Sequence, residues 1–149
     1  MPKPLQVHIK LTDPNATVPS YATAHSAGAD LYLCAESDLT VSPGETVLAH
    51  TGVSMEIPEG YVGLIFARSG LATKRHLAPA NKVGVIDSDY RGEIMVPVHN
   101  HGQETQTVRP GERIAQMVFL EYGKADFVCL DELNETDRGT GGFGSTGTV

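Results

Sequence analysis

Short runs in which apolar side chains dominate, or alternate with polar ones, recur along this chain. In residues 7–11 every second side chain is apolar, which is the pattern of a β-strand with one buried face. Further runs of this kind lie at residues 31–34, 46–48, 53–57, 62–66, 83–86, 94–98, 105–108, 114–120 and 127–130. Short strands that recur every ~8–12 residues are typical of an all-β sandwich or barrel.

Glycine, proline and asparagine separate many of these runs, for example at residues 43–44, 58–60 and 100–102. These residue types form turns because they restrict φ or tolerate a positive φ. The one helical signal begins at Ser69, which has the chemistry of an N-cap, and basic residues follow one turn later. The pattern therefore predicts an all-β, jelly-roll-like sandwich or barrel with one short helix.

The chain has 149 residues, of which 40% are hydrophobic, enough for one domain with a core. We expect a β domain at residues 1–136 and a flexible, glycine-rich C-terminal arm at residues 137–149. The sequence has no run of ~18 uncharged apolar residues and no apolar signal-peptide core. We therefore expect a cytoplasmic, intracellular protein that does not enter membranes. The net charge of −7 argues against a nucleic-acid partner.

The two cysteines and six histidines do not indicate a metal site. Cys34 and Cys129 each lie in an apolar run, which favours two buried free thiols over a disulfide or metal ligands. Only His99 and His101 are spaced to share one face of a strand, and a metal there would lack a third ligand.

Residues 84–93 carry the most reactive side chains of the central region. Two apolar runs, 83–86 and 94–96, flank a polar segment with Gly92 near its end, and a hairpin is the simplest interpretation. Asp87 would then be partly desolvated and close to Asp89, and both effects raise the pKa of a carboxyl group toward that of a general base. The alternative is that these aspartates only stabilise a turn.

The segment Arg68, Ser69 and Gly70 predicts a phosphate-binding site. A helix N-terminus offers unpaired N–H groups, the serine adds a hydroxyl, and arginine binds phosphate oxygens with two donors. The surrounding region is basic within an acidic protein, as expected for a site that receives a small anion. The alternative is a capped helix beside a solvated arginine.

Two further polar residues lie next to apolar strands. Asp30 begins an apolar strand, where it would line a site or bond to local N–H groups. Gln116 lies among apolar neighbours in the run at residues 114–120, and a buried amide without partners costs ~1–3 kcal/mol. The alternative for Gln116 is a hydrogen bond to a neighbouring loop.

The C-terminal arm is rich in glycine and has one arginine, Arg138, and one aromatic residue, Phe143. It is neither a dinucleotide-binding fingerprint, which needs a following helix, nor a P-loop, since Ser145 occupies the lysine position. The backbone N–H groups, hydroxyls and arginine of the arm could bind phosphates, and the Phe143 ring could cover a base. The alternative is a disordered tail.

Five segments taken together are more specific than any one of them: residues 27–32, 68–72, 84–92, 113–116 and 138–147. In order and spacing they resemble the five motifs of the trimeric deoxyuridine triphosphate nucleotidohydrolases, the trimeric dUTPase family. Ala67 stands where many members of the family have proline, and Met117 replaces a common leucine. These differences concern local rigidity and not the reaction.

The resemblance implies a jelly-roll-like fold, a homotrimer, and active sites that combine segments of several subunits, with the C-terminal arm closing over the nucleotide. It also implies Mg²⁺-assisted attack of water on the α-phosphorus of dUTP, which gives dUMP and pyrophosphate. Such a reaction limits uracil incorporation into DNA and supplies dUMP for thymidylate synthesis.

The resemblance also implies residue roles. Asp87 would be the general base, and Tyr90 would pack under the deoxyribose. The remaining roles are uracil recognition by Asn81, Val85, Ile86 and Met95; phosphate binding by Arg68, Ser69, Gly70 and Gln116; orientation of the hydrated metal by Asp30; and the lid formed by Arg138, Phe143, Gly144, Ser145 and Thr146.

Two other functions fit parts of this pattern. A dCTP deaminase of the same superfamily would release ammonia from dCTP, and the sequence has no His/Cys zinc signature of the unrelated zinc deaminases. A non-catalytic β-sandwich module would bind dUTP without turnover.

Overall fold

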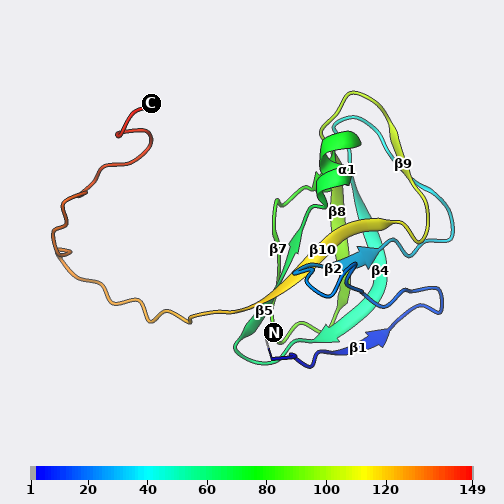
Figure 1. The fold of residues 1–149 in the computed structure, drawn as a ribbon, viewed down its shortest axis with the longest axis horizontal. Helices are drawn as coiled ribbons and strands as arrows, with labels where there is room; N and C mark the ends of the chain where they lie inside the picture. The colour runs from blue at the N-terminus through cyan, green and yellow to red at the C-terminus, as the bar shows by residue number, and fades with distance from the viewer. Residues whose placement is uncertain (1–2, 149) are drawn as a thin grey trace.

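The computed structural model describes residues 3–148 and consists mainly of antiparallel β-strands (Figure 1). Over these residues it contains ten strands and one helix. In chain order they are β1 (His8–Leu11), β2 (Ala29–Tyr32), β3 (Leu39–Val41), β4 (Thr46–Glu56), β5 (Tyr61–Phe66), α1 (Ser69–Lys74), β6 (Leu77–Pro79), β7 (Gly84–Ile86), β8 (Glu93–Asn100), β9 (Gln106–Val108) and β10 (Arg113–Glu121).

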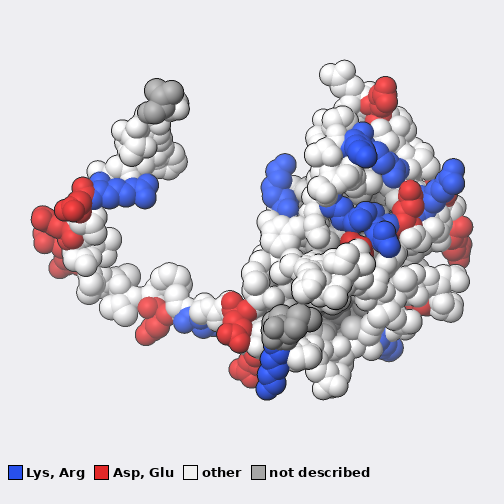
Figure 2. Space-filling model, in the orientation of Figure 1, with Lys and Arg blue, Asp and Glu red and all other residues white. Residues whose placement is uncertain are grey.

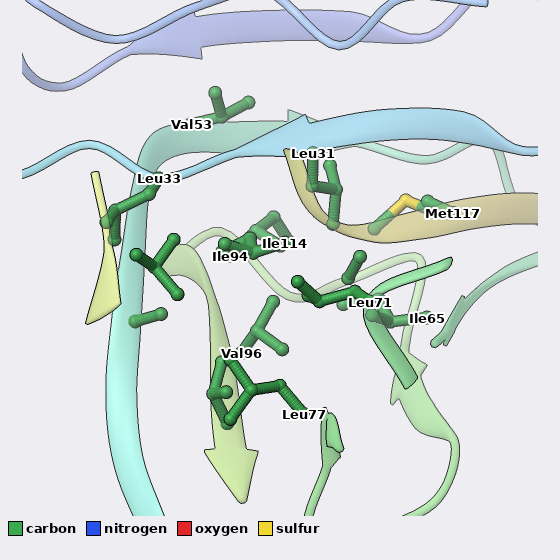
Figure 3. Close-up of a cluster of buried hydrophobic side chains, with 14 of the residues drawn as sticks. Leu31, Leu33, Val53, Ile65, Leu71, Leu77, Ile94, Val96, Ile114 and Met117 are labelled. Atoms are coloured by element: carbon green, nitrogen blue, oxygen red, sulfur yellow. The ribbon is translucent and has the colours of Figure 1, made fainter. Parts of the chain in front are cut away.

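Two four-stranded sheets and one two-stranded sheet enclose the core. Their strand orders are β1-β4-β8-β6, β2-β10-β5-β7 and β3-β9. Alternate residues of β8 are buried, as expected for a strand with one face on the core. Figure 3 shows side chains of both large sheets meeting in one apolar cluster, with Ile94 and Val96 from β8 and Ile65 and Met117 from the other sheet. The predicted jelly-roll-like β fold with one short helix is confirmed.

The predicted hairpin between residues 83–86 and 94–96 is wrong. Strand β7 pairs with β5, with Gly84 opposite Ile65, whereas β8 pairs with β4 and β6. The polar segment between β7 and β8 therefore crosses from one sheet to the other. Two neighbouring apolar runs fit either arrangement, because alternation identifies a buried face and not the strand that pairs with it.

Other strand boundaries also differ from the prediction. The runs at 46–48 and 53–57 fall mostly within one long strand, β4, whose register with β8 shifts between His50 and Ser54. The short strands β3 and β6 were not predicted. The strand predicted at residues 127–130 is wrong: this segment is extended but unpaired, and Phe127 is 91% exposed.

Both cysteines are free, as predicted; Cys34 is half-buried and Cys129 is exposed. Burial raises the pKa of the Cys34 thiol, and the nearby Asp13 carboxylate raises it further. The prediction that Cys129 is buried is wrong, because it lies in the exposed segment after β10.

Helix α1 begins at Ser69, so the predicted N-cap is one residue too late. Arg68 is the N-cap residue, and no side chain caps the helix. With six residues, the one helix of the described chain is too short to span a bilayer.

After β10 the chain leaves the body, and residues 122–148 contain neither helix nor strand (Figure 1). This stretch is called the C-terminal segment below. The division of the chain between residues 136 and 137 stays a prediction.

Candidate active site

A cleft of about 590 Å³ lies where β2, β10 and the start of α1 meet. Strand β10 runs between β2 and β5, so that Gln116 has Asp30 opposite it on one side and Phe66 on the other. Two residues beyond Phe66, the chain turns into α1 with Arg68 and Ser69. The larger cleft therefore brings together five predicted site residues: Asp30, Arg68, Ser69, Gly70 and Gln116.

Asp30 is buried, with 5% of its surface exposed, and both of its oxygens are paired with arginines. Arg68 Nε lies 3.0 Å from Oδ1, and Arg113 Nε lies 3.3 Å from Oδ2. A buried carboxylate needs such partners, and an arginine that bonds through Nε keeps its two terminal nitrogens for other contacts. Asp30 thus orients Arg68 at the wall of the cleft. Figure 2 shows basic side chains gathered on the body just below α1.

Arg113 also packs over Tyr32, with its guanidinium carbon 5.9 Å from the ring centre. The Tyr32 hydroxyl lies 2.6 Å from Ser20 Oγ. These two neighbours lower the pKa of the Tyr32 phenol, Ser20 by its hydrogen bond and Arg113 by hydrogen bonding and charge. Sequence reasoning did not assign Arg113 to the site. The sequence signal was only a basic residue three positions before Gln116; the pairing of its strand with the one containing Asp30 is seen only in the structure.

The Gln116 amide is held in place on two sides. Its Nε2 donates to the backbone carbonyl of Ala67 at 2.9 Å, which is the loop contact considered as its alternative role. On the other side lies Gly28, where a Cβ would come within 2.2 Å of Gln116 Oε1. Gly28 therefore makes room for the amide, and Gln116 both bonds the loop and lines the cleft.

A second, smaller pocket of about 260 Å³ contains Asp87 and all the residues predicted to hold the nucleoside except Asn81. Its lining is Leu48, Val85, Ile86, Asp87, Tyr90, Glu93 and Met95. The Tyr90 hydroxyl donates to the backbone carbonyl of Glu93 at 2.8 Å, which fixes the ring. Sequence reasoning missed Leu48 and Glu93, since no local pattern connects residues 48 and 93 with the segment at 85–90.

Two predictions about this region differ from the structure. Asp87 is exposed, so the predicted desolvation of its carboxyl group is wrong for the single chain. In the polar segment between β7 and β8, residues 89–92 are exposed as well, and Ser88 is half-buried. Asn81 is exposed in the turn before β7 and lines neither the cleft nor the pocket among the described residues.

A single chain does not bring together the three predicted parts of the site, which are the phosphate-binding residues, the nucleoside-binding residues and the lid. The larger cleft and the smaller pocket share no lining residue in the described part of the chain. The lid residues lie on the C-terminal segment, away from the body (Figure 1), where Phe143 is fully exposed. Within that segment, Arg138 Nε donates to the carbonyl of Gly141. Gly144, Ser145 and Thr146 are exposed as well.

Comparison with known proteins agrees with this geometry. The dUTPase family model matches residues 14–147. A deoxyuridine 5'-triphosphate nucleotidohydrolase of Desulfitobacterium hafniense is 55% identical, over 87% of each chain. A protein of the same name from Acinetobacter baumannii is 47% identical, over 96% of this chain and 99% of its own. The solved structure of the Staphylococcus bacteriophage 80alpha dUTPase with dUpNHpp superposes with a TM-score of 0.89 at 27% identity, over 96% of this chain and 99% of that one.

The fold, the cleft and these relatives define the chain as a nucleotidohydrolase, an enzyme that cleaves nucleotides with water. Within that class, the chain belongs to the dUTPase family. The prediction of an enzyme of the dUTP diphosphatase type is confirmed.

Proposed function

We propose that this chain hydrolyses dUTP to dUMP and pyrophosphate by attack of water on the α-phosphorus, with Asp87 as the general base. The observation that carries the proposal is the convergence of Arg68, Ser69, Gly70 and Gln116 on one cleft, in a member of the dUTPase family. The reaction would limit uracil incorporation into DNA and supply dUMP for thymidylate synthesis. A cytoplasmic location stays a prediction.

The larger cleft would bind the triphosphate. Arg68 is oriented by the buried Asp30 carboxylate, and charge-assisted hydrogen bonds from a guanidinium to phosphate are stronger than neutral ones. Ser69 and Gly70 add a hydroxyl and backbone N–H groups at the start of α1. Gln116, fixed by Ala67 and Gly28, adds an amide that can donate to a phosphate oxygen.

The smaller pocket would bind the nucleoside. The Tyr90 ring forms a wall that a deoxyribose fits and a 2′-hydroxyl overlaps, which suits rejection of UTP. The strands that carry Val85, Ile86 and Met95 would present donors and acceptors to the uracil edge. Asn81, which is exposed in the turn before β7 and outside the pocket of the single chain, would join them when the nucleotide binds. Asp87 in this pocket would take a proton from water as the water oxygen bonds to the α-phosphorus. The bond from that phosphorus to the bridging oxygen then breaks, and pyrophosphate leaves.

A homotrimer would complete each site. In a single chain the cleft and the pocket are separate, and the pocket faces solvent, with Val85 61% exposed and Asp87 open to water. The C-terminal segment also exposes Phe127, Leu130 and Leu133, and large apolar side chains of this kind indicate a surface that another chain covers. A neighbouring subunit that joined cleft to pocket would bury Asp87 and bring it to the phosphates.

The residues of this site suit a Mg²⁺ ion that binds together with the substrate and is held mainly by its phosphates. Among residues 3–148, no three His, Cys, Asp or Glu side chains are grouped to hold a metal by themselves. Asp30 is the one described carboxylate in the larger cleft, and both of its oxygens bond arginines. It would therefore act on a hydrated ion through water, as suits an ion held mainly by phosphates. When bound, the ion offsets phosphate charge and polarises the reacting phosphorus.

The lid residues Arg138, Phe143, Gly144, Ser145 and Thr146 would close over the nucleotide. The Phe143 ring is fully exposed in the single chain, so a bound base is a natural partner for it. Arg138 and the two hydroxyls would reach phosphate oxygens, and closure would exclude bulk water from the reaction.

A pyrophosphate-release assay with dUTP, dCTP, dTTP and UTP, with and without Mg²⁺, tests the proposal. We expect Mg²⁺-dependent release from dUTP and much slower release from the other three. Ammonia release from dCTP without cleavage of dUTP would point to a deaminase. Binding of dUTP without turnover, with Mg²⁺ present, would point to a non-catalytic module.

A further inference from the structure

Glu93, the first residue of β8, connects the smaller pocket to two residues of β4. Its Oε2 lies 2.6 Å from His50 Nδ1, and its Oε1 accepts a hydrogen bond from the backbone N–H of Gly52 at 3.0 Å. Its side chain is largely shielded, with 24% exposed. Glu93 also lines the pocket that contains Asp87 and Tyr90.

Gly52 supplies a backbone N–H donor that Glu93 binds at an irregular point of β4. The pairing of β4 with β8 shifts register between His50 and Ser54, and Gly52 adopts a φ of +68° there, a conformation that favours glycine. A Cβ at this position would lie 2.7 Å from Ala16 Cβ. The Gly52 N–H therefore points out of the regular ladder, and the Glu93 carboxylate supplies the acceptor that a backbone donor requires.

Tyr90 depends on the same stretch of backbone. Its hydroxyl donates to the Glu93 carbonyl at 2.8 Å. Its ring lies against Gly92, where a Cβ would come within 2.4 Å of the hydroxyl oxygen. The position of the ring is thus set by residues 92 and 93, and the Glu93 side chain ties these residues to β4.

We propose that Glu93 is a positioning residue for substrate selection. By holding Gly52 and His50, it fixes the start of β8 and with it the Tyr90 ring that faces the sugar. Selection of dUTP over UTP then depends on Glu93, although its side chain need not touch the ribose. This inference rests on the proposed hydrolysis of dUTP.

The test compares kcat and KM for dUTP and UTP in the wild type, Glu93→Ala and Glu93→Gln. In Glu93→Ala the Tyr90 ring is held less firmly. We expect the ratio of kcat/KM for dUTP to kcat/KM for UTP to fall about tenfold, because steric exclusion of a hydroxyl provides ~10²-fold selection in all and only part of it would be lost. Glu93→Gln should restore most of the ratio. Its amide oxygen can accept from Gly52 N–H and its amide NH₂ can donate to His50.

Glu56→Ala is the matched control. Glu56 is also a carboxylate bonded across strands to a histidine, with Oε2 3.3 Å from His8 Nδ1, but the pair is exposed and away from the pocket. It should leave the ratio unchanged. If Glu93→Ala does not fold, Glu93→Asp replaces it, because the shorter side chain cannot reach both Gly52 and His50.

The outcomes separate the two proposals. A wild type that does not cleave dUTP overturns the proposed function. A wild type that cleaves and selects dUTP, with a Glu93→Ala variant that keeps the ratio, overturns only the role of Glu93. Equal losses for dUTP and UTP in Glu93→Ala would make Glu93 a stabilising residue and would also overturn the inference.

Discussion

Replacing Gly28 with alanine perturbs the phosphate-binding amide without changing any polar group. The new methyl carbon would lie 2.2 Å from Gln116 Oε1, 2.9 Å from Cδ and 3.1 Å from Cβ. The first two atoms are at the end of a flexible side chain, so the clash is relieved by rotation of Gln116. That rotation breaks its 2.9 Å hydrogen bond to Ala67 and moves the amide out of its place in the cleft.

The size of the effect follows from two hydrogen bonds of the Gln116 amide, one to Ala67 and one to the substrate. The hydrogen bond to Ala67 contributes ~0.5–1.5 kcal/mol, and the remaining crowding at Cβ brings the loss of unfolding free energy to ~1–2 kcal/mol. A hydrogen bond to a charged phosphate is worth ~1.5–3 kcal/mol. We therefore expect kcat/KM for dUTP to fall about 10- to 150-fold.

The assay is steady-state pyrophosphate release, with thermal unfolding measured in parallel. Gly123→Ala is the matched control, since the same methyl there meets nothing within 4 Å. Gln116→Ala should reproduce the loss of kcat/KM, and adding Gly28→Ala to it should lower kcat/KM little further, because Oε1 and Cδ, the two closest atoms, are gone and only the 3.1 Å contact at Cβ remains. Wild-type kcat/KM in Gly28→Ala, or full additivity in the double variant, would refute the role of the Gln116 amide.

Three further predictions concern the base, the lid and the thiols. Asp87→Asn should lower kcat by ~10²–10⁴ while dUTP binding, measured by calorimetry, is largely kept; near-normal turnover would exclude Asp87 as the base. Truncation before Arg138 should abolish efficient hydrolysis but leave the folded oligomer intact in light scattering, and an unfolded product would make the removed residues structural. Cys129 should react faster than Cys34 with a thiol reagent at pH 8, measured in Cys34→Ser and Cys129→Ser variants. The pKa of Cys34 is raised, so less of it is thiolate; equal rates would contradict its shielding.

The sequence predicted the strands whose alternation reports a buried face. Strands β8 and β10 were placed within two residues at each end, because Ile94, Val96 and Met117 face one core. Strand partners were not predictable from the pattern. The pairing of β7 with β5 depends on which sheet has a free edge, and a local apolar run does not contain that information.

The polar part of the site was predictable as residue types and not as contacts. Asp30 and Arg68 were both candidates, but their ion pair joins residues 38 positions apart in the chain. The Glu93 contacts to His50 and Gly52 depend on the register shift in β4, for which the sequence signal is a single glycine, Gly52, and that glycine does not indicate which side chain bonds there. The segment at 127–130 has the apolar pattern of a strand, but it pairs with no strand among residues 3–148.

Hydrolysis of dUTP in water enriched with ¹⁸O tests the central claim most directly. If water attacks the α-phosphorus, with Asp87 taking its proton, the label appears in dUMP and the pyrophosphate stays unlabelled. Label in the pyrophosphate would show that water attacks the β-phosphorus instead, and would contradict the account.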